Sequence, residues 1–242
     1  ALSVTSGAAI TDSGVITVAG TSSFTTDVND KDIILNQSNA MSGNITVSTA
    51  GTGGDVTIDN GTTALGIQGT INGGLTVVNG AAITDSDTLT VTGASSFTID
   101  TGSNHITLGT AALTGAIGVS TTGTSNFTLD NTTTAVNLGT VGVTGALSVT
   151  SGAAITDSGV ITVTGTATFV TDVNDIDITL NQSNAIAGAL TFTTNTGGSN
   201  GADITLNNGS TAISLAGFTT RGNLTLETTN AIALPGHTVN GN

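Results

Sequence analysis

The chain lacks cysteine, tryptophan and tyrosine, and its 242 residues include one proline. Without cysteine no disulfide can stabilise the fold, and nothing in the sequence demands an oxidising compartment. Charged residues make up 7% of the chain, whereas about 25% is usual in globular proteins. Lys31 and Arg221 are the only basic residues, and the formal net charge is −14. Because phosphates are neutralised by Lys and Arg, nucleic acid is excluded as a partner and an anionic membrane surface is disfavoured.

Long apolar runs are also absent, although hydrophobic residues reach 37%. None approaches the roughly 20 residues that a membrane helix needs, so we predict no membrane insertion. Helix-forming Glu, Lys and Arg are scarce, and no segment keeps a 3.6-residue period. The first residues contain no charged n-region and no apolar h-region, so we expect no signal peptide in this sequence, and we expect either a mature processed chain or a part of a longer one.

What the sequence does contain is a long internal repeat. Residues 1–18 recur unchanged at 146–163, and a looser copy begins at Gly74. Because repeats of this kind bury their apolar residues against neighbouring units, we expect a single solenoid domain, 1–242. It divides into three long repeats and a partial fourth: 1–73, 74–145, 146–222 and 223–242.

Triplets of apolar, small polar and apolar residues recur within each repeat, as in Leu2-Ser3-Val4 and Ile106-Thr107-Leu108. This pattern predicts short strands whose outer apolar side chains face the interior and whose central Thr or Ser faces solvent. Gly, Asn, Asp and Ser separate the triplets and favour tight turns. We therefore predict an all-β fold, a right-handed parallel β-helix (β-solenoid). We expect about three short strands per coil, about three coils per long repeat and nine to ten coils in all, a rod on the order of 45 Å long. Four phenylalanines are expected inside: Phe24, Phe97, Phe127 and Phe169.

The first residues show no polar cap, and we expect self-association by head-to-tail stacking of coils. Near the other end, Leu234-Pro235-Gly236-His237 contains the only proline, which predicts a stop to strand pairing.

Two acidic turns form the clearest polar clusters: Asp27, Asn29, Asp30 and Asp32, and again Asp172, Asn174, Asp175 and Asp177. Their carboxylate and amide oxygens suit Ca²⁺, which takes six to eight oxygen ligands. The residue order differs from the EF-hand loop and from the glycine-rich nonapeptide of other β-helices. The alternative is that these residues only shape turns through local hydrogen bonds.

Asp85 and Asp87, with sister positions Asp12 and Asp157, invite comparison with the paired carboxylates of glycoside hydrolases. The chain has no Trp or Tyr to stack on a sugar, so we expect no enzyme. A carbohydrate-binding or polysaccharide-cleaving module is one alternative, and ice binding by outward Thr is a second. His105 and His237 are isolated, which argues against zinc.

Three segments resemble the repeats of large secreted bacterial adhesins of the filamentous haemagglutinin type. They are GNLTLETTNAIAL (222–234), GALSVTSGAAITDSGVITVTGTATF (145–169) and DIDITLNQSNAIAGALTFT (175–193). The resemblance implies a secreted β-helical fibre that attaches the bacterial cell surface to other cells, surfaces or biofilm matrix, through an unidentified surface or glycan receptor. We therefore expect a structural and adhesive extracellular protein.

Overall fold

The computed structural model describes residues 1–195, 197–198 and 201–234, and this part of the chain contains strands and turns but no helix. No segment in these residues could therefore cross a membrane as a helix. Sheet A contains, in spatial order, β1 (Leu2–Ser6), β4 (Ser22–Thr26), β7 (Ile45–Thr49), β9 (Leu65–Ile71), β11 (Ile83–Val91), β13 (Ile106–Leu108), β16 (Phe127–Asp130), β18 (Leu147–Ser151), β21 (Ala167–Asn174), β24 (Ala189–Asn195), β26 (Ile213–Thr219) and β28 (Ile232–Ala233), with β14 (Ala111–Leu113) beside β11.

Sheet B contains β2 (Ile10–Thr11), β5 (Ile33–Leu35), β8 (Val56–Asp59), β10 (Leu75–Asn79), β12 (Ser95–Ile99), β15 (Ala116–Ser120), β17 (Val136–Val143), β19 (Ile155–Asp157), β22 (Ile178–Leu180), β25 (Ile204–Asn207) and β27 (Leu224–Glu227), with β20 (Ile161–Val163) and β23 (Ala185–Ile186) off this path. A small third sheet pairs β3 (Thr17–Val18) with β6 (Ala40–Met41).

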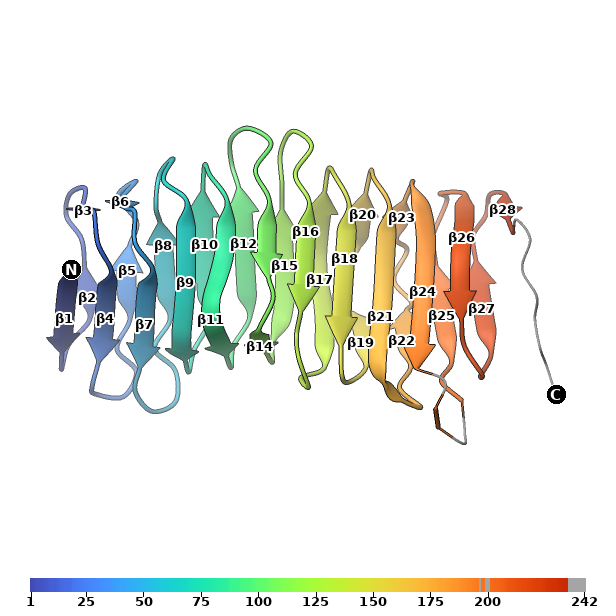
Figure 1. Cartoon of the computed structure of the whole chain (residues 1–242), viewed down its shortest axis with the longest axis horizontal. Helices are drawn as coiled ribbons and strands as arrows, with labels where there is room; N and C mark the ends of the chain where they lie inside the picture. The colour runs from blue at the N-terminus through green and yellow to red at the C-terminus, as the bar shows by residue number, and fades with distance from the viewer. Residues whose placement is uncertain (196, 199–200, 235–242) are drawn as a thin grey trace.

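The chain winds into a β-solenoid of about 11 turns. In Figure 1 the strands of sheet A run downward in front and those of sheet B run upward behind, while successive turns advance from left to right. That course is right-handed, as parallel crossovers generally are. The predicted right-handed parallel β-helix is thus confirmed. At a strand separation of about 4.8 Å, about 11 turns give a rod roughly 50 Å long.

Every turn has one strand in sheet A and one in sheet B, and a third side is present only in parts of the rod. It consists of β3 with β6, of the ends of β9 and β11 with β14, and of the end of β17 with β20 and β23. The expectation of three strands per coil therefore holds in these turns. Elsewhere two sheets close the coil between them.

The interior is a continuous stack of Ile, Leu, Val and Phe along the rod. All four phenylalanines expected there are at most 1% exposed. Phe169 stacks on Phe192 of the next turn, with ring centroids 5.5 Å apart. Strand alternation explains this arrangement, because the apolar residues of each triplet point inward together.

Each long repeat contains three and a half turns, rather than the three that we expected. From β1 the sheet A strands β4, β7 and β9 mark three turns, and β10, which opens the second repeat, follows half a turn later in sheet B. Equivalent residues therefore alternate between the sheets: Leu2 lies in sheet A, Leu75 in sheet B, Leu147 in sheet A and Leu224 in sheet B. The extra half turn per repeat explains why the rod has about 11 turns instead of nine or ten.

Candidate functional site

The broad faces of the two sheets are the most extensive surface that the rod offers. At the centre of most sheet A strands one side chain points outward, and register aligns these residues in columns: Ser3, Ser23, Thr46 and Gln68, and then Thr84, Thr107, Thr128, Ser148, Thr168 and Thr191. Sheet B carries corresponding columns: Thr11, Ile34, Thr57, Thr76 and Ser96, and then Asn137, Thr156, Thr179, Thr205 and Thr225. Both faces are therefore rich in hydroxyl groups, and their central columns carry no charge.

Acidic residues lie away from these columns, and several carboxylates hold neighbouring turns together. Asp157 is 8% exposed, and its carboxylate accepts hydrogen bonds from the N–H groups of Asn181 (2.8 Å) and Gln182 (3.2 Å) and from the side-chain amide of Asn184 (2.7 Å). Asp12 binds Asn36, Gln37 and Asn39 in the same way. The carboxylates at these two sister positions thus serve as turn-to-turn connections.

Asp85, the candidate partner of Asp87, has the same role. Its Oδ1 accepts the Gly109 N–H at 2.8 Å, and its Oδ2 accepts the Thr110 N–H at 2.6 Å. Asp87 accepts the N–H of its neighbour Thr88 at 2.8 Å. Because both carboxylates accept backbone hydrogen bonds, the geometry gives no support to a catalytic pair, and the expectation that the chain is no enzyme stays a prediction.

The two acidic turns lie between β4 and β5 and between the end of β21 and β22. Asp30 and Asp175 adopt left-handed backbone conformations, with φ of 55° and 59°. Asp32 Oδ1 accepts the N–H of Asp55 at 2.9 Å, and Asp177 Oδ1 accepts that of Asp203 at 2.8 Å. The left-handed conformations of Asp30 and Asp175 are those that tight turns favour, whereas Asp32 and Asp177 connect neighbouring turns of the rod.

Within the described ranges no group of three or more His, Cys, Asp or Glu side chains is arranged to hold a metal ion. A calcium ion at the acidic turns would depend on amide and backbone oxygens as well. The calcium hypothesis for these turns therefore stays a prediction. His105 is exposed and its Nδ1 accepts the Asn126 N–H at 3.0 Å, while Pro235, Gly236 and His237 lie outside the described residues.

Three buried asparagines that sequence reasoning missed close the third side of the coil. Asn60, Asn131 and Asn208 are each 0% exposed. The Asn131 amide accepts the Leu113 N–H at 2.8 Å and donates to the Leu113 carbonyl at 3.0 Å, so it replaces the strand that would otherwise follow β14. Asn60 pairs with Met41, the last residue of β6, in the same way, and Asn208 pairs with Ile186, the last residue of β23. A recurring pattern, Asp or Asn, then Asn, and Thr-Ala after two further residues, could have revealed them.

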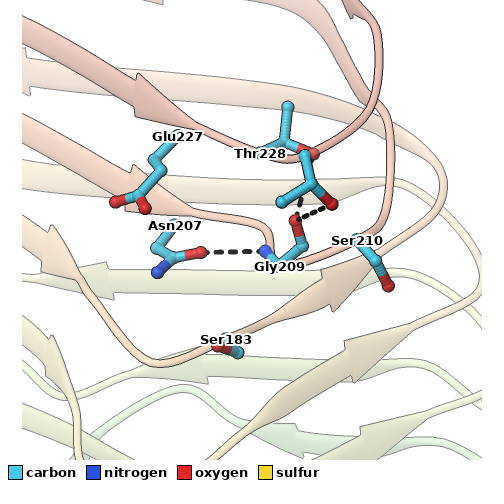
Figure 2. A pocket seen from close by; sticks show the side chains of 7 residues that line it. Ser183, Asn207, Gly209, Ser210, Glu227 and Thr228 are labelled. Atoms are coloured by element: carbon cyan, nitrogen blue, oxygen red, sulfur yellow. Dashed lines mark hydrogen bonds between the residues drawn. The ribbon is translucent and has the colours of Figure 1, made fainter.

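A shallow polar hollow lies near the last turns, shown in Figure 2. Its volume is about 410 Å³, and its lining residues are Ser183, Asn207, Gly209, Ser210, Glu227, Thr228 and Thr229. Within it the Gly209 N–H donates to Asn207 Oδ1 at 2.9 Å, and the Thr228 hydroxyl donates to the Gly209 carbonyl at 3.3 Å. Glu227 is the single ionisable group in the lining. The hollow thus contains hydrogen-bonding groups without a second acid or base to act beside Glu227.

The fold and the surface together define the class of protein: an elongated β-solenoid built from tandem repeats, an architecture consistent with a structural repeat protein. More particularly, the chain belongs to a family of repeats of unknown function (DUF5649), whose model matches residues 1–48, 53–123 and 124–193. Neither a curated protein nor a solved structure matches the chain. The family match supports the repeat β-structure, but it does not extend to adhesins of the haemagglutinin type.

Proposed function

We propose that the chain is a structural and adhesive rod of a bacterial surface, located outside the cell. The observation that carries this proposal is the unbroken ladder of parallel strands, in which two sheets continue along the whole described rod (Figure 1). A ladder of this kind is stiff because each turn is hydrogen-bonded to the turns on both sides. The function of the protein would then depend on the length of the rod and on the area of its faces.

Composition favours an extracellular setting. Lys31 and Arg221 are the only residues after which trypsin could cleave, so a folded rod would resist trypsin-like proteases. The resemblance of the repeats to secreted adhesins points the same way. Neutral hydroxyl faces suit attachment to uncharged surfaces and glycans, since no charged group has to be desolvated there.

Both ends of the described rod offer unpaired strand edges. β1 pairs only with β4, and β28 pairs only with β26. A further turn, from adjoining sequence or from another copy of the chain, would satisfy the free N–H and C=O groups of these edges. We expect end-to-end stacking by this route, and contacts that do not close on themselves produce filaments.

Two experiments test the proposal. Electron microscopy of the purified chain should reveal threads one rod wide, and antibody labelling of intact producing cells should detect the repeats without permeabilisation. Short single rods at every concentration would contradict end-to-end stacking. Labelling only after permeabilisation would contradict the extracellular assignment.

A further inference from the structure

The odd number of half turns in each long repeat gives the rod two interchangeable faces. Val56-Thr57-Ile58 lies in sheet B, and the equivalent Phe127-Thr128-Leu129 lies in sheet A. The next copy, Ile204-Thr205-Leu206, is again in sheet B. A surface encoded once per long repeat is therefore displayed on both sides of the rod.

These faces are suited to contact with each other. Figure 1 shows the strands of sheet A running nearly parallel along the whole rod, with little accumulated twist. Flat sheets of many strands are unusual and are typically stabilised by stacking or by side-chain ladders. Because the faces stay flat, two rods could make contact along their full length.

Charge distribution removes the main obstacle to such contact. The chain carries a net charge of −14, yet the central outward columns contain Ser, Thr, Gln, Asn, Gly and Ile. The acidic residues lie in turns, at strand ends, or where the register of β11 and β21 is irregular. Asp130 in sheet A, and Asp59 and Glu227 in sheet B, lie at strand ends beside the central columns. The carboxylates of Asp59 and Asp130 accept N–H groups of the adjoining turns. Two faces could therefore meet along their central columns while these carboxylates stay at the rim of the contact, in water.

We propose that rods associate side by side, with sheet A of one copy against sheet B of the next. Most strands of sheet B have two to five residues. A face roughly 50 Å long and about 13 Å wide therefore covers about 650 Å². Stable interfaces bury about 600–1,000 Å² per partner, so the face reaches the lower end of this range. Since each rod keeps one free face after pairing, the contact propagates and produces layered rafts. This inference goes beyond the end-to-end assembly proposed above, because it concerns the sides of the rod.

Matched variants at equivalent positions test it. Thr128→Asp places a charge at the centre of sheet A, and Thr57→Asp does so in sheet B. In sedimentation velocity runs on the purified chain, the wild type should form laterally associated species that grow with concentration. Either variant alone should remain unpaired, with a dissociation constant at least roughly tenfold higher, because a charge would be buried unpaired.

Mixing the two variants is the decisive experiment. Each retains the face that the other has lost, so the mixture should form one-to-one pairs and stop there. Ser103→Asp, in the exposed turn after β12, should leave the wild-type behaviour unchanged. Circular dichroism and thermal melting of each variant would show that it is folded.

Several outcomes would overturn the proposal: a wild type that never associates laterally, a Thr128→Asp variant that still forms rafts, or a mixture that forms no pairs. Binding of ice or of a neutral glucan to the sheet A face of an unassociated rod would assign that face to another occupant. In micrographs, single-width threads without rafts would support end-to-end stacking alone, and rafts of short rods would support lateral association alone.

Discussion

Replacing Asn131 by Ala should open the third side of the coil at β14. The Asn131 side chain makes four hydrogen bonds, with the N–H and C=O of Leu113 and with the carbonyls of Thr134 and Ala135 (both 3.1 Å). Alanine cannot replace any of them, and the site is closed to water, since Asn131 is 0% exposed.

The size of the effect follows from these four bonds. Because the two N–H donors of Asn131 serve three carbonyls, the four contacts count as about three bonds of about 0.5–1.5 kcal/mol net each. The buried Leu113 N–H left without a partner adds about 1 kcal/mol, so the surrounding turns lose about 4 kcal/mol. In a repeat rod each turn contacts only its neighbours, and the damage stays local. Opening at the Leu113 amide should then become roughly a thousandfold more frequent.

Native-state hydrogen exchange measures this opening directly. The Leu113 amide of Asn131→Ala should exchange far faster than in the wild type, while amides around Leu35, several turns away, should keep their protection. Asn137→Ala is the control, because Asn137 lies on β17 and its buried Oδ1 has no hydrogen-bond partner; its removal should not destabilise the chain and should leave the Leu113 amide protected. If Leu113 kept wild-type protection in the Asn131 variant, the reasoning about strand replacement would be refuted.

Three further substitutions test other contacts of the rod. Gly69→Ala should destabilise by about 2–3 kcal/mol in denaturant titration, because Gly69 has a φ of 121° and an added Cβ would lie 2.0 Å from the Val47 carbonyl oxygen; a neutral result would contradict that backbone geometry. Asp157→Asn should cost about 2–3 kcal/mol, since an amide turned toward the Asn184 amide loses an acceptor, and unchanged thermal melting would count against the turn-to-turn role. Phe169→Ala should cost about 3–5 kcal/mol by removing the stack on Phe192, whereas a loss below about 1 kcal/mol would mean that the interior is loosely packed.

Much of the fold could be predicted because the triplets alternate apolar and polar residues as a β-strand does. Leu147-Ser148-Val149, for example, places two apolar side chains inside and one hydroxyl outside, and no helical period competes with this pattern. Winding was predictable for the same reason, since triplets this short bury their apolar residues only against neighbouring turns.

The half turn was not predictable from the triplets, because a strand in sheet A and a strand in sheet B have the same pattern. Leu2-Ser3-Val4 and Leu75-Thr76-Val77 look alike in sequence, yet they lie on opposite faces. What the triplets do not encode is the length of each turn, which depends on the residues that connect one strand to the next. Asn60 and Asn131 determine where the third side ends, and thus how many residues a turn consumes, but a buried Asn and an exposed turn Asn have the same letter.

The candidate site was predicted less well than the fold. In the sequence, carboxylates such as Asp85 and Asp157 resemble the paired acids of a catalytic site. In the structure they accept backbone hydrogen bonds from the next turn. Their partners follow 24 or 25 residues later, and only the turn length makes that spacing meaningful.

The central claim is that a long repeat makes three and a half turns, and spin-label distances test it most directly. The chain has no cysteine, so pairs of cysteines can be introduced and labelled at Ser3 with Ser148, and at Ser3 with Thr76. Ser3 and Ser148 should lie on one face, seven turns or about 34 Å apart, and Ser3 and Thr76 should be separated by about 17 Å along the axis plus the thickness of the rod. Distances of about 29 Å and about 14 Å, which six turns and three turns on a single face would give, would contradict the alternation of faces.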